Sequence, residues 1–327
     1  MTPSHPLCRP FERQIRLFGK QLPRAVNGEI EPLHQCRIAT RRLREILPLC
    51  ASEAPRGVAA RARRRLRRVG RALGGVREID VALGLVDEFT QRGVVDADAA
   101  ERLHQHLRDE RDERRERLLD RLSAVNTRRL ERDLAEVARV LGMRDQTDVW
   151  ARTLAARLRR RAQRVREAVS AAGALYTSDR VHRVRITAKQ LRYALEFAGD
   201  SREGRTKGAV RVVKGLQEIL GRLHDLEVLA GTIQDFIVPS VDHASWNSDL
   251  KRFRLELDRE CRELHSRYVA RREDLLEICD MTSRLAVRIW TDRGGEIPSQ
   301  PVVKARARVL KMGLAGSWPA DRKAARH

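Results

Sequence analysis

The chain contains no proline between Gly57 and Ile237, and this absence constrains the fold more than any other feature. Proline breaks the interior of a helix, so a long stretch without it is typical of long helices and not of a turn-rich β fold. Apolar residues in this stretch recur at three- and four-residue intervals, as in "VRVVKGLQEILGRL", and the alternation expected of strands is missing. We therefore predict an all-α protein.

The periodicity predicts six helices in each half of the chain. A short segment at 142–148, "GMRDQTD", joins the halves and offers Asp145 or Thr147 as a helix cap. We predict a first helical half-repeat over 1–143, a second over 144–292, and a basic, loosely ordered tail over 293–327. The predicted helices cover 9–20, 31–47, 57–73, 75–92, 97–123, 127–141, 147–172, 179–198, 206–221, 223–236, 242–268 and 271–289.

The charge of the chain indicates a polyanionic partner. Sixty-seven basic residues against 45 acidic ones give a net charge of +22, and since only eight of the basic residues are Lys, 67 − 8 = 59 are Arg. Nucleic acid, an anionic membrane surface and a phosphate polymer are all compatible with such a charge. Arginine suits phosphate in particular, because its planar guanidinium donates to two oxygens at once and stays charged.

The five cysteines form no CxxC pair and are odd in number, which disfavours a disulfide framework and a cysteine zinc site. No stretch is long and apolar enough to suggest a membrane span, and the N-terminal residues lack the apolar run of a signal peptide. We expect a soluble, cytoplasmic protein with no membrane partner.

One phrase occurs twice, 148 positions apart: "HQCRIATRRLREIL" from His34 and "HRVRITAKQLRYAL" from His182. On a helical wheel with His34 at 0°, the three cations of the first copy fall between about 280° and 340°, beside an apolar arc near 120–220°. The second copy repeats this plan. Each helix is therefore expected to bury one flank and to hold a line of cations beside it. The two stripes are His34, Arg37, Arg41 and Arg44, and His182, Arg185, Lys189 and Arg192.

A second repeat follows the first one. "LGGVREIDV" (73–81) aligns with "LGRLHDLEV" (220–228) at an offset of 147, and we interpret each Leu-Gly step as a helix break. At the same offset, Arg64 and Arg67 match Arg211 and Lys214. Two copies of one plan imply two similar bundles related by a pseudo-two-fold axis, with the cations converging on a shared groove or pore. Cations packed so closely repel one another unless an anion relieves them. The alternative is that the stripes are only a solvated basic surface.

These motifs resemble the CHAD domain family, the conserved histidine α-helical domain. The resemblance rests on "HQCRIATRRLR" and "HRVRITAKQLR" and on "LGGVRE" and "LGRLHD", and it spans about residues 5 to 290. It implies two helical halves with pseudo-two-fold symmetry around a basic central cavity that binds inorganic polyphosphate. The ligands it implies are His34, Arg37, Arg41, Arg42, Arg44, His182, Arg185, Lys189 and Arg192, with Arg64, Arg67, Arg211 and Lys214 completing the lining and Arg77 and His224 beside them.

The chain departs from the family pattern at two positions. Gln190 stands opposite Arg42, where the family usually has a cation, so the second half is expected to hold one phosphate less firmly. Glu78 replaces the more usual Asp. Some relatives carry a fused triphosphate-tunnel domain with an E-x-E-x-K signature, but "EIEPL" (29–33) lacks the Lys and a β-rich context, so we expect no such domain.

We predict binding of inorganic polyphosphate without catalysis, metal or cofactor, and association with polyphosphate granules is compatible with this. Other polyanions are further candidate partners. Nucleic acid is the first alternative, although single-strand binding favours stacking aromatics, and the chain has only four Trp, three Tyr and six Phe. A metal-dependent phosphohydrolase is the second, suggested by "HD" at 224–225 and by His34 and His182 as candidate metal ligands.

Overall fold

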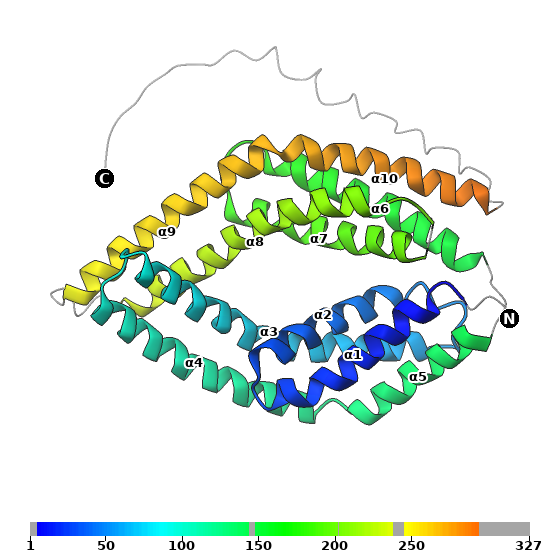
Figure 1. Cartoon of the computed structure of the whole chain (residues 1–327), viewed down its shortest axis with the longest axis horizontal. Helices are drawn as coiled ribbons and strands as arrows, with labels where there is room; N and C mark the ends of the chain where they lie inside the picture. The colour runs from blue at the N-terminus through cyan, green and yellow to red at the C-terminus, as the bar shows by residue number, and fades with distance from the viewer. Residues whose placement is uncertain (1–4, 144–147, 202, 238–244, 294–327) are drawn as a thin grey trace, which may run out of the picture. The chain divides into compact units, whose positions relative to one another are not determined.

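The computed structural model describes residues 5–143, 148–201, 203–237 and 245–293, and these fold into ten α-helices with no strand (Figure 1). The all-α prediction is confirmed. Residues 1–295 belong to one compact unit, while the basic tail predicted over 293–327 lies, apart from its first residue, outside the described residues. The helices are α1 (Cys8–Val26), α2 (Ile30–Ile46), α3 (Val58–Gln91), α4 (Ala97–Ser123), α5 (Thr127–Met143), α6 (Val149–Ala172), α7 (Ser178–Asp200), α8 (Lys207–Phe236), α9 (Ser245–Ala270) and α10 (Arg272–Asp292).

The predicted helix break at each Leu-Gly step is wrong, because α3 and α8 run through these steps without interruption. A glycine inside a helix costs only about 1 kcal/mol relative to alanine. Burial of the neighbouring apolar residues, such as Leu73 and Val76 on α3, outweighs that cost. Gly74 also has a packing role, since a Cβ there would lie 3.0 Å from Nη1 of Arg37. Each half therefore has five helices where the pattern predicted six.

The other helix boundaries agree with the predicted ones to within three residues, except that α1 ends at Val26, six residues beyond its predicted end at 20. The start of α4 is fixed by Asp96, whose side chain accepts a hydrogen bond of 2.9 Å from the backbone N–H of Asp98. The caps expected at Asp145 and Thr147 lie outside the described residues.

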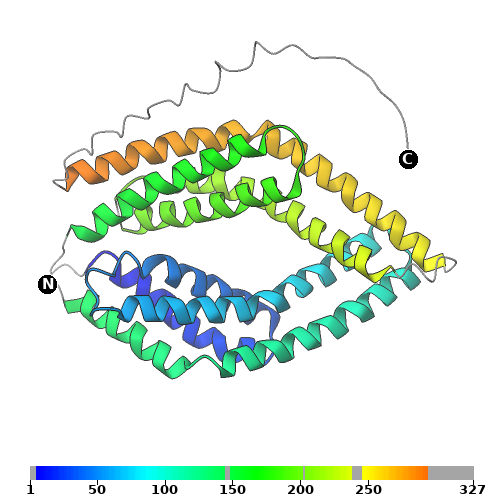
Figure 2. The same ribbon diagram turned by 180° about the vertical axis from the view of Figure 1, so that it is seen from behind.

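Within this unit, α2 packs between α1 and α3, and α7 packs between α6 and α8. Figures 1 and 2 show α1, α2 and α5 opposite α6, α7 and α10, while α3–α4 and α8–α9 extend toward the same end. The first five helices contact the last five through the pairs α2–α7, α3–α8 and α4–α9. The two repeated helices, α2 and α7, therefore face each other across the unit.

Each repeated helix buries its predicted apolar arc. Cys36, Ala39 and Leu43 of α2 are fully buried, as are Val184 and Leu191 of α7. Burying apolar surface contributes about 25 cal/mol per Å², so these arcs fix the rotation of both helices and with it the direction of the cationic stripes. No helix among the described residues is long and apolar enough to cross a membrane.

Polar and aromatic contacts tie the two groups of helices together far from the stripes. Arg222 of α8 donates to both carboxylate oxygens of Glu88 of α3 at 2.6 Å and to Glu260 of α9 at 3.0 Å. The rings of Phe89 and Phe253 lie 5.2 Å apart beside this cluster. A bidentate pair of this kind is more geometrically demanding than a simple ion pair. These contacts hold α3 against α8 and α9 and so fix the spacing between the stripes.

Candidate anion-binding site

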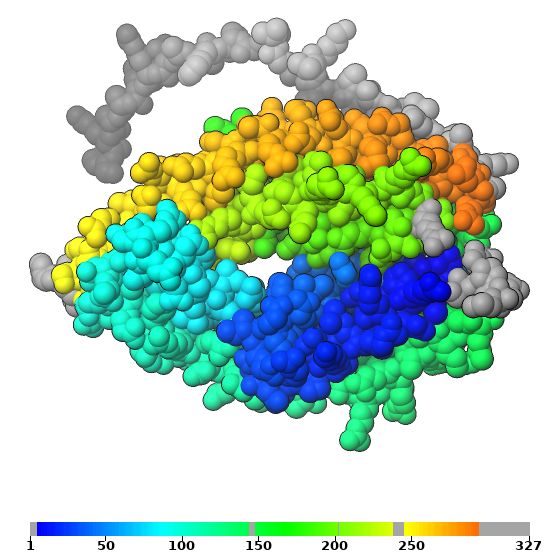
Figure 3. Space-filling model, viewed as in Figure 1, coloured from blue at the N-terminus to red at the C-terminus, as the bar shows by residue number. Residues whose placement is uncertain are grey.

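A pocket of about 280 Å³ lies where α2, α3, α7 and α8 meet, and we call it the four-helix pocket. Figure 3 shows the surface hollowed through between the blue-to-cyan atoms of α2 and α3 and the green atoms of α7 and α8. Four helices from distant parts of the chain thus contribute to one site. Its lining residues are His34, Arg37, Ile38, Arg41, Arg77, Glu78, Val81, Arg185, Lys189, His224, Asp225 and Val228.

The first half contributes three guanidinium groups to this pocket. Arg37 and Arg41 lie one turn apart on α2, and Arg77 comes from α3. Nη1 of Arg37 is buried, and no hydrogen-bond acceptor among the described residues lies within reach of it. A buried donor without an acceptor costs about 1–3 kcal/mol, and an anion in the pocket would remove this cost.

The second half contributes Arg185 and Lys189 from α7 and the pair His224–Asp225 from α8. Arg185 lies 3.9 Å from the carboxylate of Asp225, which is a loose ion pair. His224 shares a contact of 3.2 Å between its Nδ1 and that of His182. His182 is thus held behind the pocket wall and is not among the lining residues.

Burial, reinforced by neighbouring cations, lowers the pKa of three basic residues of the pocket. Burial, together with the nearby Arg41 and Arg185, lowers the pKa of Lys189 to about 7. Burial first and the neighbouring cations second also lower the pKa of Arg37. His224 has its pKa lowered to about 4 by burial and by Arg185, so this imidazole is neutral at pH 7. The pocket therefore holds charges that are unfavourable without an anion.

The two carboxylates in the wall do not balance the five basic side chains. Glu78 is already engaged by Arg114 of α4, at 3.4 Å. Burial raises the pKa of Asp225, although Arg185 and Lys189 act in the opposite direction. The site therefore has more cations than carboxylates. Of the two carboxylates, Asp225 pairs with a cation of the pocket, Arg185, and Glu78 pairs with Arg114 outside it.

Tyr193 of α7 makes a contact that the repeated pattern did not predict. Nη1 of Arg41 donates to the hydroxyl of Tyr193 at 2.9 Å, and the guanidinium carbon lies 5.8 Å from the ring centroid. This hydrogen bond joins the stripe on α2 directly to helix α7. The sequence signal was present, since Tyr193 follows Arg192 inside the repeated phrase, but its partner is 152 residues away.

Four predicted ligands on α2 and α7, three of them from the stripes, lie outside the four-helix pocket. Arg42 forms an ion pair of 3.4 Å with Glu196, and Arg192 donates to the same carboxylate at 2.9 Å. Arg44 lies one turn beyond Arg41, where burial and Arg67 lower its pKa. The fourth is His182, behind the wall. Each stripe spans about three helical turns, and the pocket ends before the last of its residues, so Arg44 and Arg192 lie beyond the lining.

The four cations of the second repeat, Arg64, Arg67, Arg211 and Lys214, are exposed and do not line this pocket. The reason is the continuity of α3 and α8. Arg67 precedes Arg77 by ten residues, which is about 15 Å along one straight helix. A break at the Leu-Gly step would have let these cations fold back, but the uninterrupted helix keeps them away.

Metal ligation was one of the sequence hypotheses for the histidines. His34 and His182 do not face each other: the first lines the four-helix pocket, and the second contacts His224. Among the described residues, no group of three or more His, Cys, Asp or Glu side chains is arranged to hold a metal ion. The donor set of the pocket is cationic, and such a set suits an anionic ligand.

Comparison with known proteins agrees with the motifs. No curated protein matches the chain. The fold is similar to the crystal structure of the CHAD domain from the plant Ricinus communis, with a TM-score of 0.56 and 22% identity over 79% of this chain and 87% of that one. It is also similar to PptA from Streptomyces chartreusis, with a TM-score of 0.53 and 17% identity over 88% of this chain and 100% of that one. The family model of the CHAD domain matches residues 10–234, more than half of the sequence, and the chain therefore belongs to the CHAD domain family.

Proposed function

We propose that this protein binds inorganic polyphosphate in the four-helix pocket and does so without catalysing a reaction. The observation that carries the proposal is the convergence of Arg37, Arg41 and Arg77 from one half with Arg185 and Lys189 from the other. Membership of the CHAD domain family supports the same ligand, because CHAD domains bind polyphosphate.

The chemistry of the pocket suits a flexible chain of phosphates. Each guanidinium donates to two oxygens in one plane, and hydrogen bonds between charged groups are about twice as strong as neutral ones. Binding also releases the counterions condensed on the polymer, so affinity falls steeply as salt rises. Nη1 of Arg37 and Nε of Arg185 both lack an acceptor among the described residues, and a phosphate oxygen in the pocket would remove the penalty of such a donor.

We further propose that residues 1–143 and 144–292 are two half-repeats related by a pseudo-two-fold axis. The support is the shared order of helices, with α2 followed by the long α3 and α7 followed by the long α8. Contacts of α2 with α7 and of α3 with α8 are those that such an axis between the halves would generate. The axis would pass through the four-helix pocket, and its cations would then face one polymer from two sides.

The test removes the four stripe cations of the pocket together. We expect the variant R37A/R41A/R185A/K189A to lose polyphosphate affinity by at least about 1,000-fold at moderate salt, because the three guanidinium contacts alone contribute about 1.5 kcal/mol or more each. Titration of a long-chain polyphosphate, followed by calorimetry, measures the loss. The slope of log affinity against log salt concentration should also become shallower, since fewer counterions are released.

The matched control removes four exposed arginines for which no ion pair is found among the described residues, Arg128, Arg132, Arg159 and Arg164. It changes the net charge by the same amount and should keep most of the affinity. Equal losses in both variants would mean that overall charge alone attracts the polymer, and the pocket would be rejected. Displacement of polyphosphate by duplex DNA or RNA at equal phosphate concentration would favour nucleic acid instead. Release of phosphate from long chains would contradict the absence of catalysis.

A further inference from the structure

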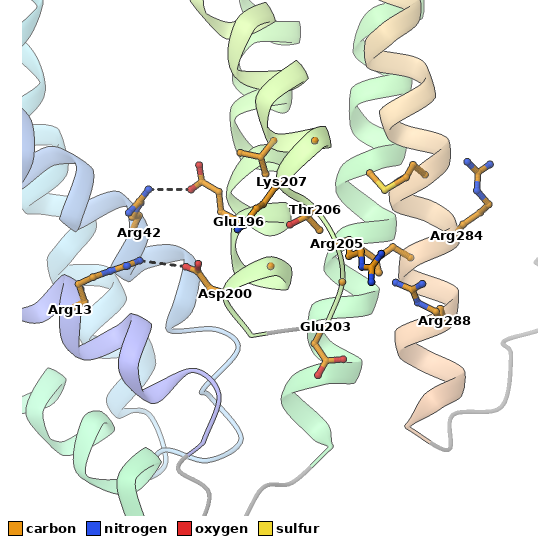
Figure 4. A pocket seen from close by; sticks show the side chains of 16 residues that line it. Arg13, Arg42, Glu196, Asp200, Glu203, Arg205, Thr206, Lys207, Arg284 and Arg288 are labelled. Carbon is orange, nitrogen blue, oxygen red and sulfur yellow. Dashed lines mark hydrogen bonds and ion pairs between the residues drawn. The ribbon is translucent and has the colours of Figure 1, made fainter.

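A second and larger pocket, of about 1620 Å³, lies between the α7–α8 turn and α10, and we call it the α10 pocket (Figure 4). No lining residue of the four-helix pocket belongs to it. Its wall includes Arg42, which was predicted as a polyphosphate ligand, and three carboxylates. The carboxylates of this wall are all paired with cations, whereas some of its cations have no carboxylate partner among the described residues, and this excess of cations indicates an anionic ligand.

Every carboxylate of the α10 pocket already has a cationic partner. Glu196 pairs with Arg42 at 3.4 Å, and Asp200 pairs with Arg13 at 3.5 Å. Figure 4 shows both pairs on the side of the pocket nearest α2. Glu203 pairs with Arg293 at 2.8 Å. These three acidic groups are therefore not available to the remaining cations.

The remaining cations of the wall are Arg205, Lys207, Arg284 and Arg288, and none has a carboxylate within 4.0 Å among the residues that the structure describes. Two of them are brought together by a glycine. A Cβ at Gly204 would lie 3.5 Å from Nη2 of Arg288 and 2.7 Å from Cδ1 of Leu285, so a larger residue would require these side chains to shift where the turn packs against α10. Figure 4 shows Arg205 and Arg288 in the space between the turn and α10.

The start of α8 adds positive potential to the same place. Cations are unfavourable at the N-terminus of a helix, where the backbone carries a partial positive charge. This 30-residue helix nevertheless begins at Lys207, two residues after Arg205, and has no acidic residue in its first turn. The hydroxyl of Thr206 does not cap the helix, because it donates to the carbonyl of Leu195 at 2.8 Å. A bound anion would compensate both the helix end and the neighbouring cations.

We propose that the α10 pocket is a second anion site that binds a short oligophosphate, either free or as the phosphate chain of a nucleotide. Arg205 and Arg288 hold it from opposite walls, and Lys207 adds a third contact at the end of α8. A ligand with several linked phosphates fits better than one phosphate, because the cations are spread over two elements and one helix turn separates Arg284 from Arg288. The inference stands on these residues and does not rest on polyphosphate binding in the four-helix pocket.

The experiment titrates tripolyphosphate into the full chain and into two variants by calorimetry. R205A/R288A should lose about 100-fold or more in affinity at the α10 pocket, because it removes two charge-assisted contacts of at least about 1.5 kcal/mol each. R37A/R185A, which alters only the four-helix pocket, should leave that binding event in place. R128A/R132A removes two exposed arginines one turn apart on α5 and is the matched control, expected to behave as the unmodified chain. R288K keeps the charge but removes the bidentate guanidinium group. Its affinity for tripolyphosphate should lie between that of R205A/R288A and that of the control.

The outcomes separate the two sites. If R205A/R288A binds tripolyphosphate as the control does, the α10 pocket is not a site and the inference is overturned. Complete loss of binding in R37A/R185A would overturn it as well, because all binding would then be in the four-helix pocket. Binding unaffected by R37A/R185A but lost in R205A/R288A would support the inference while contradicting the proposed function. A titration with ATP distinguishes the source of the phosphate chain, and citrate bound as tightly as tripolyphosphate would overturn the choice of phosphate.

Discussion

The stripe on α2 and the stripe on α7 carry the same pattern but hold different kinds of charge. Position 41 on α2 is Arg, and the matching position 189 on α7 is Lys. Arg41 donates to Tyr193 across the interface, whereas burial among cations lowers the pKa of Lys189 to about 7. Guanidinium groups stay charged in such surroundings, and an ammonium group does not. The charge at position 41 is therefore permanent, whereas the charge at position 189 depends on pH.

The residues one turn earlier, Arg37 on α2 and Arg185 on α7, also differ in their partners. Arg37 has a buried Nη1 without an acceptor, while Arg185 has Asp225 at 3.9 Å. Arg37 thus keeps a donor for a ligand, while the charge of Arg185 is partly compensated by Asp225. Nε of Arg185 is likewise buried without an acceptor among the described residues. The comparison teaches that equal spacing of cations in a sequence does not mean equal attraction for a polyanion, because the surroundings set the charge each one presents.

The largest expected difference between the halves is that between R41A and K189A. At a pH of about 8.5, where most Lys189 is neutral, R41A should weaken polyphosphate binding about tenfold or more and K189A by less than about twofold. Calorimetric titration at constant salt measures both. Similar losses of affinity in R41A and K189A at this pH would show that Lys189 is still charged, and would contradict the difference between the two positions.

A control separates the charge of Arg41 from its placement. Y193F removes the hydrogen bond that orients Arg41 but leaves the guanidinium in place. Because a single neutral-partner hydrogen bond contributes about 1 kcal/mol, the affinity of Y193F should fall by no more than about fivefold.

The next effect is a dependence of binding on pH. Lys189 gains its proton as pH falls through about 7, so polyphosphate affinity of the unmodified chain should rise by several-fold between about pH 8.5 and pH 6. K189R carries a permanent charge, and its affinity should be nearly constant over this range. Fluorescence or calorimetric titrations at matched ionic strength give both curves.

The other titratable groups of the pocket contribute less over the same range. Burial first and Arg77 second lower the pKa of His34, and burial and Arg185 lower the pKa of His224 to about 4, so His224 stays neutral over this range. A K189R curve as steep as that of the unmodified chain would assign the effect to these histidines and reject the role of Lys189.

Much of the fold could be predicted from the sequence because helical periodicity is a local signal. The apolar arc of each repeated phrase, such as Cys36 and Leu43 on α2, is buried as the wheel predicted. The failures were the two breaks at Leu-Gly steps. Whether a glycine ends a helix depends on what packs against it, and the packing of Arg37 beside Gly74 is a tertiary contact that periodicity does not contain.

The site was predictable in part for a similar reason. Repeated spacing identified the middle of each stripe, including Arg37 and Arg185, which line the four-helix pocket. Spacing did not reveal how far along the helix the pocket extends, and so Arg64 and Arg211 were included although they are exposed elsewhere. The α10 pocket left no signal, since Arg205 and Arg288 belong to no repeated phrase and meet only through the packing of the turn on α10.

The smallest expected effect concerns Gln190, the position where the second half lacks the cation found at Arg42. The resemblance to the family suggested that this half holds one phosphate less firmly. Arg42, however, pairs with Glu196 and lines the α10 pocket, so the matching position on α7 should not face a ligand in the four-helix pocket either. Q190R should therefore change long-chain polyphosphate affinity by less than about twofold, because a charge that stays solvated adds little to a contact it does not make. Calorimetric titration beside the unmodified chain decides this, and a gain of tenfold would show that position 190 reaches the polymer and that the two halves differ by one ligand after all.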